Sequence, residues 1–147
     1  MLSAKDLHRK KPAEQRTTVE KWVAWRRAGD PQAAGFWRAA TAVLSLEVQT
    51  GADVKALLLD ELVASARFLG SDAKPLARAL GSFVRRAPLQ TLGATLRAVE
   101  ALFGTSARVT SVGLLRTLAA RRDLGPAEHA AVIDTVAAIL GPPRISA

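Results

Sequence analysis

The stretch ARFLGSDAKPLARALGSFVRRA, residues 66–87, contains the signals that decide the fold. Gly70 ends one helical segment, and Ser71 and Asp72 supply capping side chains for the next one. After that turn, Leu76, Leu80, Phe83 and Val84 recur at spacings of three and four, as on one buried face of a helix. The stretch therefore predicts a helix end, a tight turn and a second, amphipathic helix.

Glycine, proline and capping residues divide the rest of the chain in the same way. No segment alternates apolar and polar residues with a period of two, so we expect no strands. Residues 53–69 are apolar nearly all round, which predicts a central helix, and Thr50 to Asp53 have capping-box spacing. We expect an all-α compact bundle of about seven helices. They cover residues 13–28, 31–49, 53–69, 73–87, 88–103, 106–122 and 126–140.

Length and composition predict one helical domain, residues 13–147, preceded by a flexible basic N-terminal tail, residues 1–12. The chain has 147 residues and no cysteine, so it folds without disulfides and is compatible with a reducing compartment. No apolar run is long enough to span a membrane, and the N-terminus lacks the apolar region of a secretory signal. We expect a cytoplasmic protein.

A weak internal repeat accompanies these helices. The segments ARFLGSDAK (66–74), EALFGTSAR (100–108) and AAILGPPRI (137–145) share the order helix end, glycine, helix start, and Arg85-Arg86 recurs as Arg121-Arg122. A period near 35 residues is typical of helical-hairpin repeats. Any run of medium-length helices ended by glycine also produces this pattern, so the sequence leaves both interpretations open.

The net charge of +8 is unevenly distributed along the chain. Residues 1–40 hold nine Lys or Arg against four acids, and residues 76–125 hold eight against two. Residues 41–75, between them, hold three against five. Basic blocks of this kind attract nucleic acid, anionic membranes or acidic proteins. The alternative is a solvated surface that serves only solubility.

Residues 73–87 place Lys74, Arg78 and Arg85 on one helix face, with Ser82 between them. Arginine forks suit phosphate oxygens, and such contacts give affinity without sequence reading. The alternative is again a scattered solvated face, and Arg121 and Arg122 are favoured at a helix C-terminus in any case. The candidate nucleic-acid-binding residues are Lys74, Arg78, Arg85, Arg86, Arg97, Arg108, Arg116, Arg121 and Arg122, with Lys10, Lys11, Lys21, Arg26, Arg27 and Arg38 from the N-terminal block.

The tryptophans allow two interpretations. Trp22 follows Val19 at core spacing, and Phe36 and Trp37 open the next helix, so these rings can form an aromatic core between the first two helices. Alternatively, one of Trp22, Trp25 and Trp37 is exposed and stacks on a base.

The groups that enzymes need are largely absent. The histidines, His8 and His129, have no metal-ligand spacing, and no glycine-rich phosphate loop or nucleophile elbow is present. Asp60 and Glu61 are adjacent, but neighbours on a helix point about 100° apart and do not form a dyad. We therefore expect no catalysis, no cofactor, no metal and no small-molecule substrate.

Two resemblances bear on function. The segments LARALG (76–81) and PLQTLGATLRAVEALFG (88–104) resemble two helices of phage-repressor-type helix-turn-helix domains. The seven residues between Gly81 and Leu89 leave no room for a recognition helix, so major-groove reading is not expected.

The second resemblance is to the small helical subunits of class 1 CRISPR effector complexes. It is carried by ELVASARFL (61–69), LARAL (76–80), LRAVEALF (96–103) and LLRTLAARR (114–122), and the stretch that it covers has about 60 residues. It implies a basic, all-helical, non-catalytic protein that contacts RNA or displaced single-stranded DNA through backbone charge, often in several copies. The final helix has no counterpart in that family that we can place.

Together these patterns predict a non-catalytic subunit of a ribonucleoprotein assembly that binds a nucleic-acid backbone. Its partners would be RNA or single-stranded DNA and other protein subunits, including copies of itself, with no membrane. One alternative is a helical-repeat adaptor that binds a partner helix in an apolar groove. Another is a DNA-binding transcriptional regulator.

Overall fold

The computed structural model describes residues 2–45 and 48–141, and in these ranges the chain is all-α with no strand. None of the helices described is long and apolar enough to cross a membrane. The α-helices are α1 (Ala4–His8), α2 (Pro12–Arg27), α3 (Phe36–Leu44), α4 (Ala52–Ser65), α5 (Ala73–Arg86), α6 (Leu92–Phe103), α7 (Arg108–Ala119) and α8 (Pro126–Leu140). The short 3-10 turns are η1 (Pro31–Ala33), η2 (Ala66–Phe68), η3 (Gly70–Asp72) and η4 (Leu89–Thr91).

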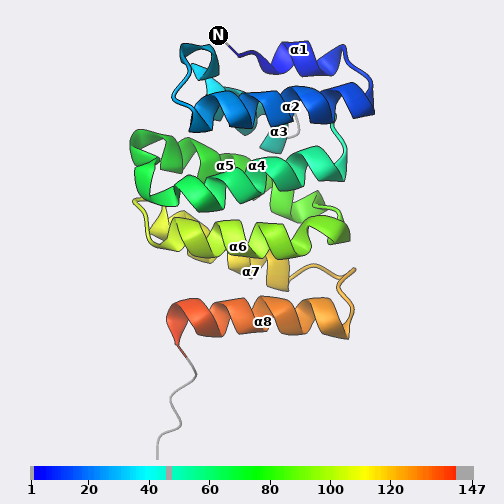
Figure 1. Ribbon diagram of the computed structural model, residues 1–147. Helices are drawn as coiled ribbons and strands as arrows, with labels where there is room; N and C mark the ends of the chain where they lie inside the picture. Colours follow the sequence, from blue (N-terminus) through cyan, green and yellow to red (C-terminus); the bar gives the residue numbers. More distant parts are fainter. Residues whose placement is uncertain (1, 46–47, 142–147) are drawn as a thin grey trace, which may run out of the picture.

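The helices stack in two rows (Figure 1). Helices α2, α4, α6 and α8 pack on one another in chain order, and we call them the even row. Helices α3, α5 and α7 pack on one another behind them, and we call these three helices the odd row. Helix α1 packs on α3 beyond this row and is not counted in it. Since the chain alternates between rows, all helices of one row run in the same direction. Consecutive helices are thus stacked as hairpins.

The core lies between the two rows. Helix α4 packs against α2, α3 and α6, which confirms the central helix expected at residues 53–69. On α5, the predicted apolar face is buried and fits against α3 and α7. Each fully buried leucine contributes about 2 kcal/mol of transfer free energy. The fully buried leucines include Leu44, Leu58, Leu59, Leu62, Leu76, Leu80, Leu102 and Leu118.

Within the flexible tail expected at residues 1–12, the structure describes residues 2–12, and these include a packed helix. Residues Ala4–His8 form α1, which begins at the N-cap Ser3 and packs on α3. Leu7 is fully buried in the core. The side-chain amide of Gln15 donates a hydrogen bond to the carbonyl oxygen of Leu7 at 2.8 Å. The expectation was wrong because one buried leucine and one buried hydrogen bond hold a segment that is otherwise polar.

Several helices are shorter than expected. The helix predicted over 31–49 is η1 followed by α3, because Gly35 adopts a left-handed φ of 83° and separates the two. Of its C-terminal part, residues 46–47 lie outside the described residues. The helix predicted over 53–69 leaves α-geometry after Ser65, and that predicted from 88 begins as α6 only at Leu92.

The capping box expected at Thr50 to Asp53 does not form. Gly51 is the N-cap of α4, and no side chain donates or accepts a capping hydrogen bond there. The Asp53 carboxylate lies beside Gly51 and within 3.7 Å of the Arg16 guanidinium instead.

Candidate nucleic-acid interface

Acidic and basic residues are distributed differently over the two rows of helices. The odd row carries seven cations and no acid, whereas the even row carries eight acids and six cations. The odd-row cations are Arg38 on α3, Lys74, Arg78, Arg85 and Arg86 on α5, and Arg108 and Arg116 on α7. The even-row acids are Glu14, Glu20, Asp53, Asp60, Glu61, Glu100, Glu128 and Asp134, and its cations are Arg16, Lys21, Arg26, Arg27, Lys55 and Arg97.

Ion pairing follows the same division. None of the seven odd-row cations pairs with a carboxylate among residues 2–45 and 48–141, and all seven are exposed. Four of the six even-row cations do pair within the described chain. The positive charge of the odd row is therefore available to an anionic partner.

Helix α5 presents the stripe that its sequence predicts. Lys74, Arg78, Ser82 and Arg85 are all exposed, while the opposite face of the helix is buried. Pro75 fits because it stands in the first turn of the helix, where its missing N–H has no intrahelical partner. Arg86, the last residue of the helix, is exposed beside the stripe.

Helix α7 lies next to α5 and continues the cationic surface. The two helices are close enough that a Cβ added at Gly81 would lie 4.0 Å from the Leu114 side chain. Arg85 and Arg116 line one shallow hollow at their C-terminal ends. At the other end of α7, the Arg108 guanidinium lies 4.3 Å from the centre of the Phe103 ring, which holds it in place by a cation–π contact.

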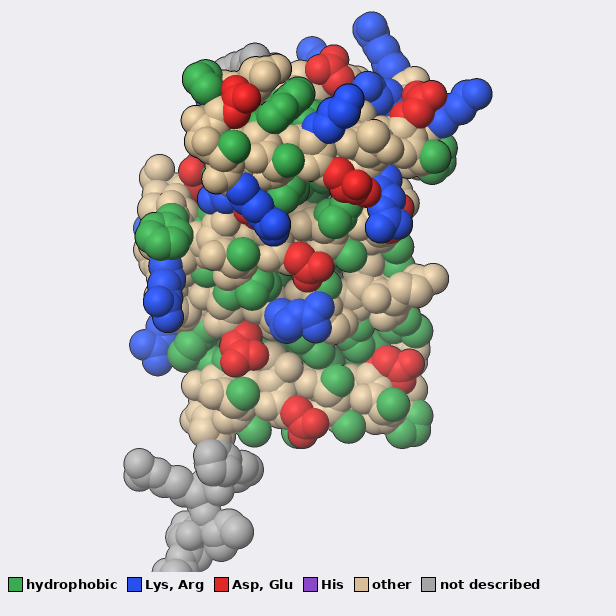
Figure 2. Space-filling view, in the orientation of Figure 1, with side chains coloured by type: hydrophobic (Ala, Val, Ile, Leu, Met, Phe, Trp, Pro, Cys, Tyr) green, Lys and Arg blue, Asp and Glu red, His purple; other side chains and the backbone are tan. Residues whose placement is uncertain are grey.

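The even row presents a mixed surface. Figure 2 shows acidic and basic side chains interspersed over the face that this row turns to the viewer. Arg97, a candidate from the sequence, lies on α6 and pairs with Asp60 of α4 at 3.5 Å. Lys21 lies on α2, away from α5 and α7. The structure therefore does not bring these two cations together with those of the odd row.

Arg26 and Arg27 serve the packing of α2 on α4. Both guanidinium groups donate to the carboxylate of Glu61 at 2.8 Å, and the Glu61 side chain is only 2% exposed. The Arg26 guanidinium also lies 4.8 Å from the centre of the Trp37 ring. These contacts satisfy a buried carboxylate, so the structure accounts for both arginines without a ligand.

Arg121 serves the packing of α7 on α5. Its side chain is 9% exposed and donates hydrogen bonds to the carbonyl oxygens of Val84 and Ala87 at the end of α5, and to the carboxylate of Asp123. That hydrogen-bonded guanidinium holds the pKa of the Asp123 carboxyl below its usual range. The neighbouring Arg122 is exposed.

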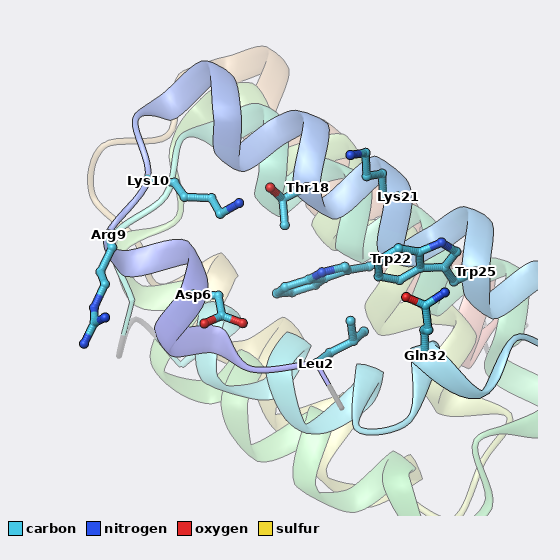
Figure 3. A pocket seen from close by; sticks show the side chains of 9 residues that line it. All are labelled: Leu2, Asp6, Arg9, Lys10, Thr18, Lys21, Trp22, Trp25 and Gln32. Atoms are coloured by element: carbon cyan, nitrogen blue, oxygen red, sulfur yellow. The ribbon is translucent and has the colours of Figure 1, made fainter.

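Lys10 and Lys11 are exposed in the connection between α1 and α2. Figure 3 shows a groove between these helices, with Lys10 at the end where they are connected, Lys21 on the side of α2, Trp22 beneath both and Arg9 directed away. Asp6 lines the same groove, so its charge is partly balanced. Arg38 is exposed on α3, at the N-terminal end of the odd row.

The tryptophans belong mainly to the core. Trp22 is 3% exposed beside fully buried Val19, and Trp37 packs edge-to-face on Phe36 with ring centres 4.8 Å apart. Trp25 is half-buried on the wall of the groove in Figure 3. Trp22 and Trp25 both line this groove, and of the two only Trp25 is partly exposed.

Sequence reasoning missed two features of this surface. One is the absence of acids from α3, α5 and α7, which counting charges by alternate helices from α3 onward would have found. The other is Lys55, which is buried on α4 and lines a hollow together with Lys10 and Arg86. The sequence did not indicate that Lys55 is buried, because a single lysine in an apolar helix is ordinarily exposed to solvent.

No cluster of three or more His, Cys, Asp or Glu side chains that could hold a metal ion occurs within residues 2–45 and 48–141. His8 and His129 are exposed and lie on helices at opposite ends of the stack. Asp60 is exposed, whereas Glu61 is buried between two arginines, so the adjacent acids face different surroundings.

The segment 76–104, which resembles part of a helix-turn-helix domain, forms the end of α5, η4 and α6. Helices α5 and α6 are consecutive α-helices of different rows, and only the short turn η4 lies between them.

Comparison with known proteins found no match to this chain among protein-family models, curated proteins or solved structures.

Proposed function

We propose that this protein binds the backbone of a single-stranded nucleic acid through the exposed face of the odd row, without catalysing a reaction. The observation that carries the proposal is the row of seven exposed cations with no acid in the same helices. Phosphates spaced along a strand match cations spaced over α3, α5 and α7. Small side chains such as Ser82, Thr110 and Gly113 lie exposed between these cations and let a strand approach the surface closely.

A role as one subunit of a larger ribonucleoprotein assembly fits this proposal. It is the role implied by the resemblance to the small subunits of class 1 CRISPR effector complexes, whose matching segments fall in α4, α5, α6 and α7. A single copy would bind RNA or single-stranded DNA with modest affinity, because backbone contacts without base reading are individually weak.

The test is a titration of labelled single strands of about 30 nucleotides, RNA and DNA, over a range of salt concentrations. We expect similar affinity for unrelated sequences and a log–log salt slope equivalent to several phosphate contacts. In the odd-row variant, Arg78→Gln, Arg85→Gln and Arg116→Gln, that slope should decrease in magnitude by about 2, since each single-strand contact contributes about 0.7.

The matched control removes three exposed charges elsewhere. The even-row variant carries Arg16→Gln and Arg97→Gln on α2 and α6, and Arg67→Gln on η2, the turn that directly follows α4, and it leaves the odd row intact. It should keep most of the affinity. Equal losses in both variants would mean that only net charge matters, and the proposed surface would be wrong.

A helical-repeat adaptor is the second candidate, favoured by α8. This helix has no Lys or Arg, and Val132 is its only buried residue. Ile133 and Leu140 are 48% and 58% exposed, which suits contact with another protein. If no strand binds even at low salt, the adaptor function becomes the better explanation and the odd row would meet an acidic protein.

A further inference from the structure

A hollow of about 770 Å³ lies at the edge of the stack where α2 and α4 begin and α5 ends. Lys10, Lys55 and Arg86 line it together with His8, and no acid is among its described lining residues. Gln49, Thr50 and Gly51 form its wall on the side of α4. We call this space the Lys55 hollow.

Lys55 is placed where a lysine destabilises the protein. The residue is 8% exposed, and its ammonium donates one hydrogen bond, to the Thr50 carbonyl oxygen at 2.8 Å. No carboxylate of residues 2–45 or 48–141 pairs with it, and burial lowers its pKa. It also stands in the first turn of α4, where the helix dipole disfavours a cation. Stability of the fold therefore does not explain this residue.

The Thr50 hydroxyl is a second unsatisfied group at the same place. Its oxygen is buried and has no hydrogen-bond partner within the described part of the chain. A buried hydroxyl without a partner costs about 1–3 kcal/mol, so native structures rarely keep one without a reason. Thr50 is one of the residues that line the Lys55 hollow, and its carbonyl oxygen accepts the hydrogen bond of Lys55, so the unpartnered hydroxyl and the unpaired ammonium lie close together.

We propose that the Lys55 hollow binds a phosphate group. Lysine binds phosphate as a point charge and the arginine fork matches its oxygens, so Lys10, Lys55 and Arg86 together suit a dianion. The carboxylate of a peptide would neutralise only one of these three cations. The bound group would be the terminal phosphate of a nucleic-acid strand or a free phosphate compound. The proposal does not rest on strand binding by the odd row.

The test follows backbone amide NMR signals during titration with inorganic phosphate at constant ionic strength. We expect saturable shifts at residues 49–55 and at Arg86 below about 20 mM phosphate. Lys55→Met should weaken binding by about tenfold or more, because it removes a charge-assisted hydrogen bond. Lys5→Met, the same change at an exposed lysine outside the hollow, should leave the affinity unchanged.

A second variant guards against misfolding. Thr50→Val removes the hydroxyl and keeps the shape of the side chain, and it should weaken phosphate binding severalfold. Lys55→Met should unfold at the same or a higher denaturant concentration than the wild type, since the buried ammonium is destabilising. Absence of saturable shifts, or equal affinity in the wild type and Lys55→Met, would overturn the proposal.

Two short strands then distinguish the sources of the phosphate. If a 5′-phosphorylated strand binds the wild type more tightly than its unphosphorylated form, and Lys55→Met removes that difference, the occupant is a strand end. If both strands bind equally while inorganic phosphate still binds, the occupant is a free phosphate compound.

Discussion

Arg121 and Arg122 are adjacent and chemically identical, yet the structure uses them differently. The Arg121 guanidinium crosses from the end of α7 to the end of α5 and satisfies carbonyl oxygens that no helical N–H can reach. Arg122 is exposed to solvent. At the scale of single residues, the cationic side chains of this protein therefore divide into those that are hydrogen-bonded within the fold and those that are exposed to solvent.

This difference predicts unequal effects of substitution. Arg121→Ala should lower the free energy of unfolding by about 2 kcal/mol, because it leaves the carbonyl oxygens of Val84 and Ala87 without donors. Arg122→Ala should change it by less than about 0.5 kcal/mol. Urea unfolding followed by circular dichroism measures both, and equal effects would show that the hydrogen bonds seen here contribute nothing to stability.

At the scale of elements, α1 shows how little apolar surface is needed to dock a short helix. It has five residues, of which Leu7 alone is buried. An isolated helix of that length does not form in water, so its contacts with the core must hold it. Docking α1 covers part of α3 and also brings Lys10 to the Lys55 hollow.

Leu7→Ala tests this role. Removing a fully buried leucine side chain should cost about 2–4 kcal/mol and expose the amides of α1 to hydrogen exchange. Leu2→Ala, at a residue that is only partly buried, should cost less. If Leu7→Ala leaves the free energy of unfolding unchanged, the docking of α1 does not stabilise the protein, and the interpretation of residues 1–12 as a flexible tail would be correct after all.

At the scale of the whole molecule, the separation of charge by row has an energetic consequence. The seven cations of the odd row, which pair with no carboxylate among the described residues, repel one another, and the folded state holds them closer together than the unfolded chain does. A polyanion bound along the odd row would remove that repulsion and add its own binding free energy.

The measurable result is a stability that rises with salt. The free energy of unfolding of the wild type should increase between low and physiological ionic strength, as screening weakens the repulsion. The odd-row variant should show a smaller increase, and the even-row variant should show an increase at least as large as that of the wild type. If both variants respond alike, repulsion within the odd row is not the cause.

The sequence alone determined the helical class, the approximate positions of the helices from α2 to α8 and the exposed stripe of α5. These depend on glycine, proline and on periodicity within about 15 residues, and such local signals act wherever the helix is placed. It misjudged α1 and the ends of α3 and α4, because contacts from distant parts of the chain decide where a short or frayed helix persists.

The tertiary structure alone decided which cations share a surface. Only the alternation of helices between two rows places Arg38, Arg78 and Arg116 on one side and Arg97 on the other. In the same way, Glu61 meets Arg26 and Arg27 across more than 30 residues of chain, and Lys55 meets Arg86 at one hollow. The physical reason is that the burial of apolar surface between distant segments determines which face of each helix points into the core. The positions of the charged side chains then follow from that orientation.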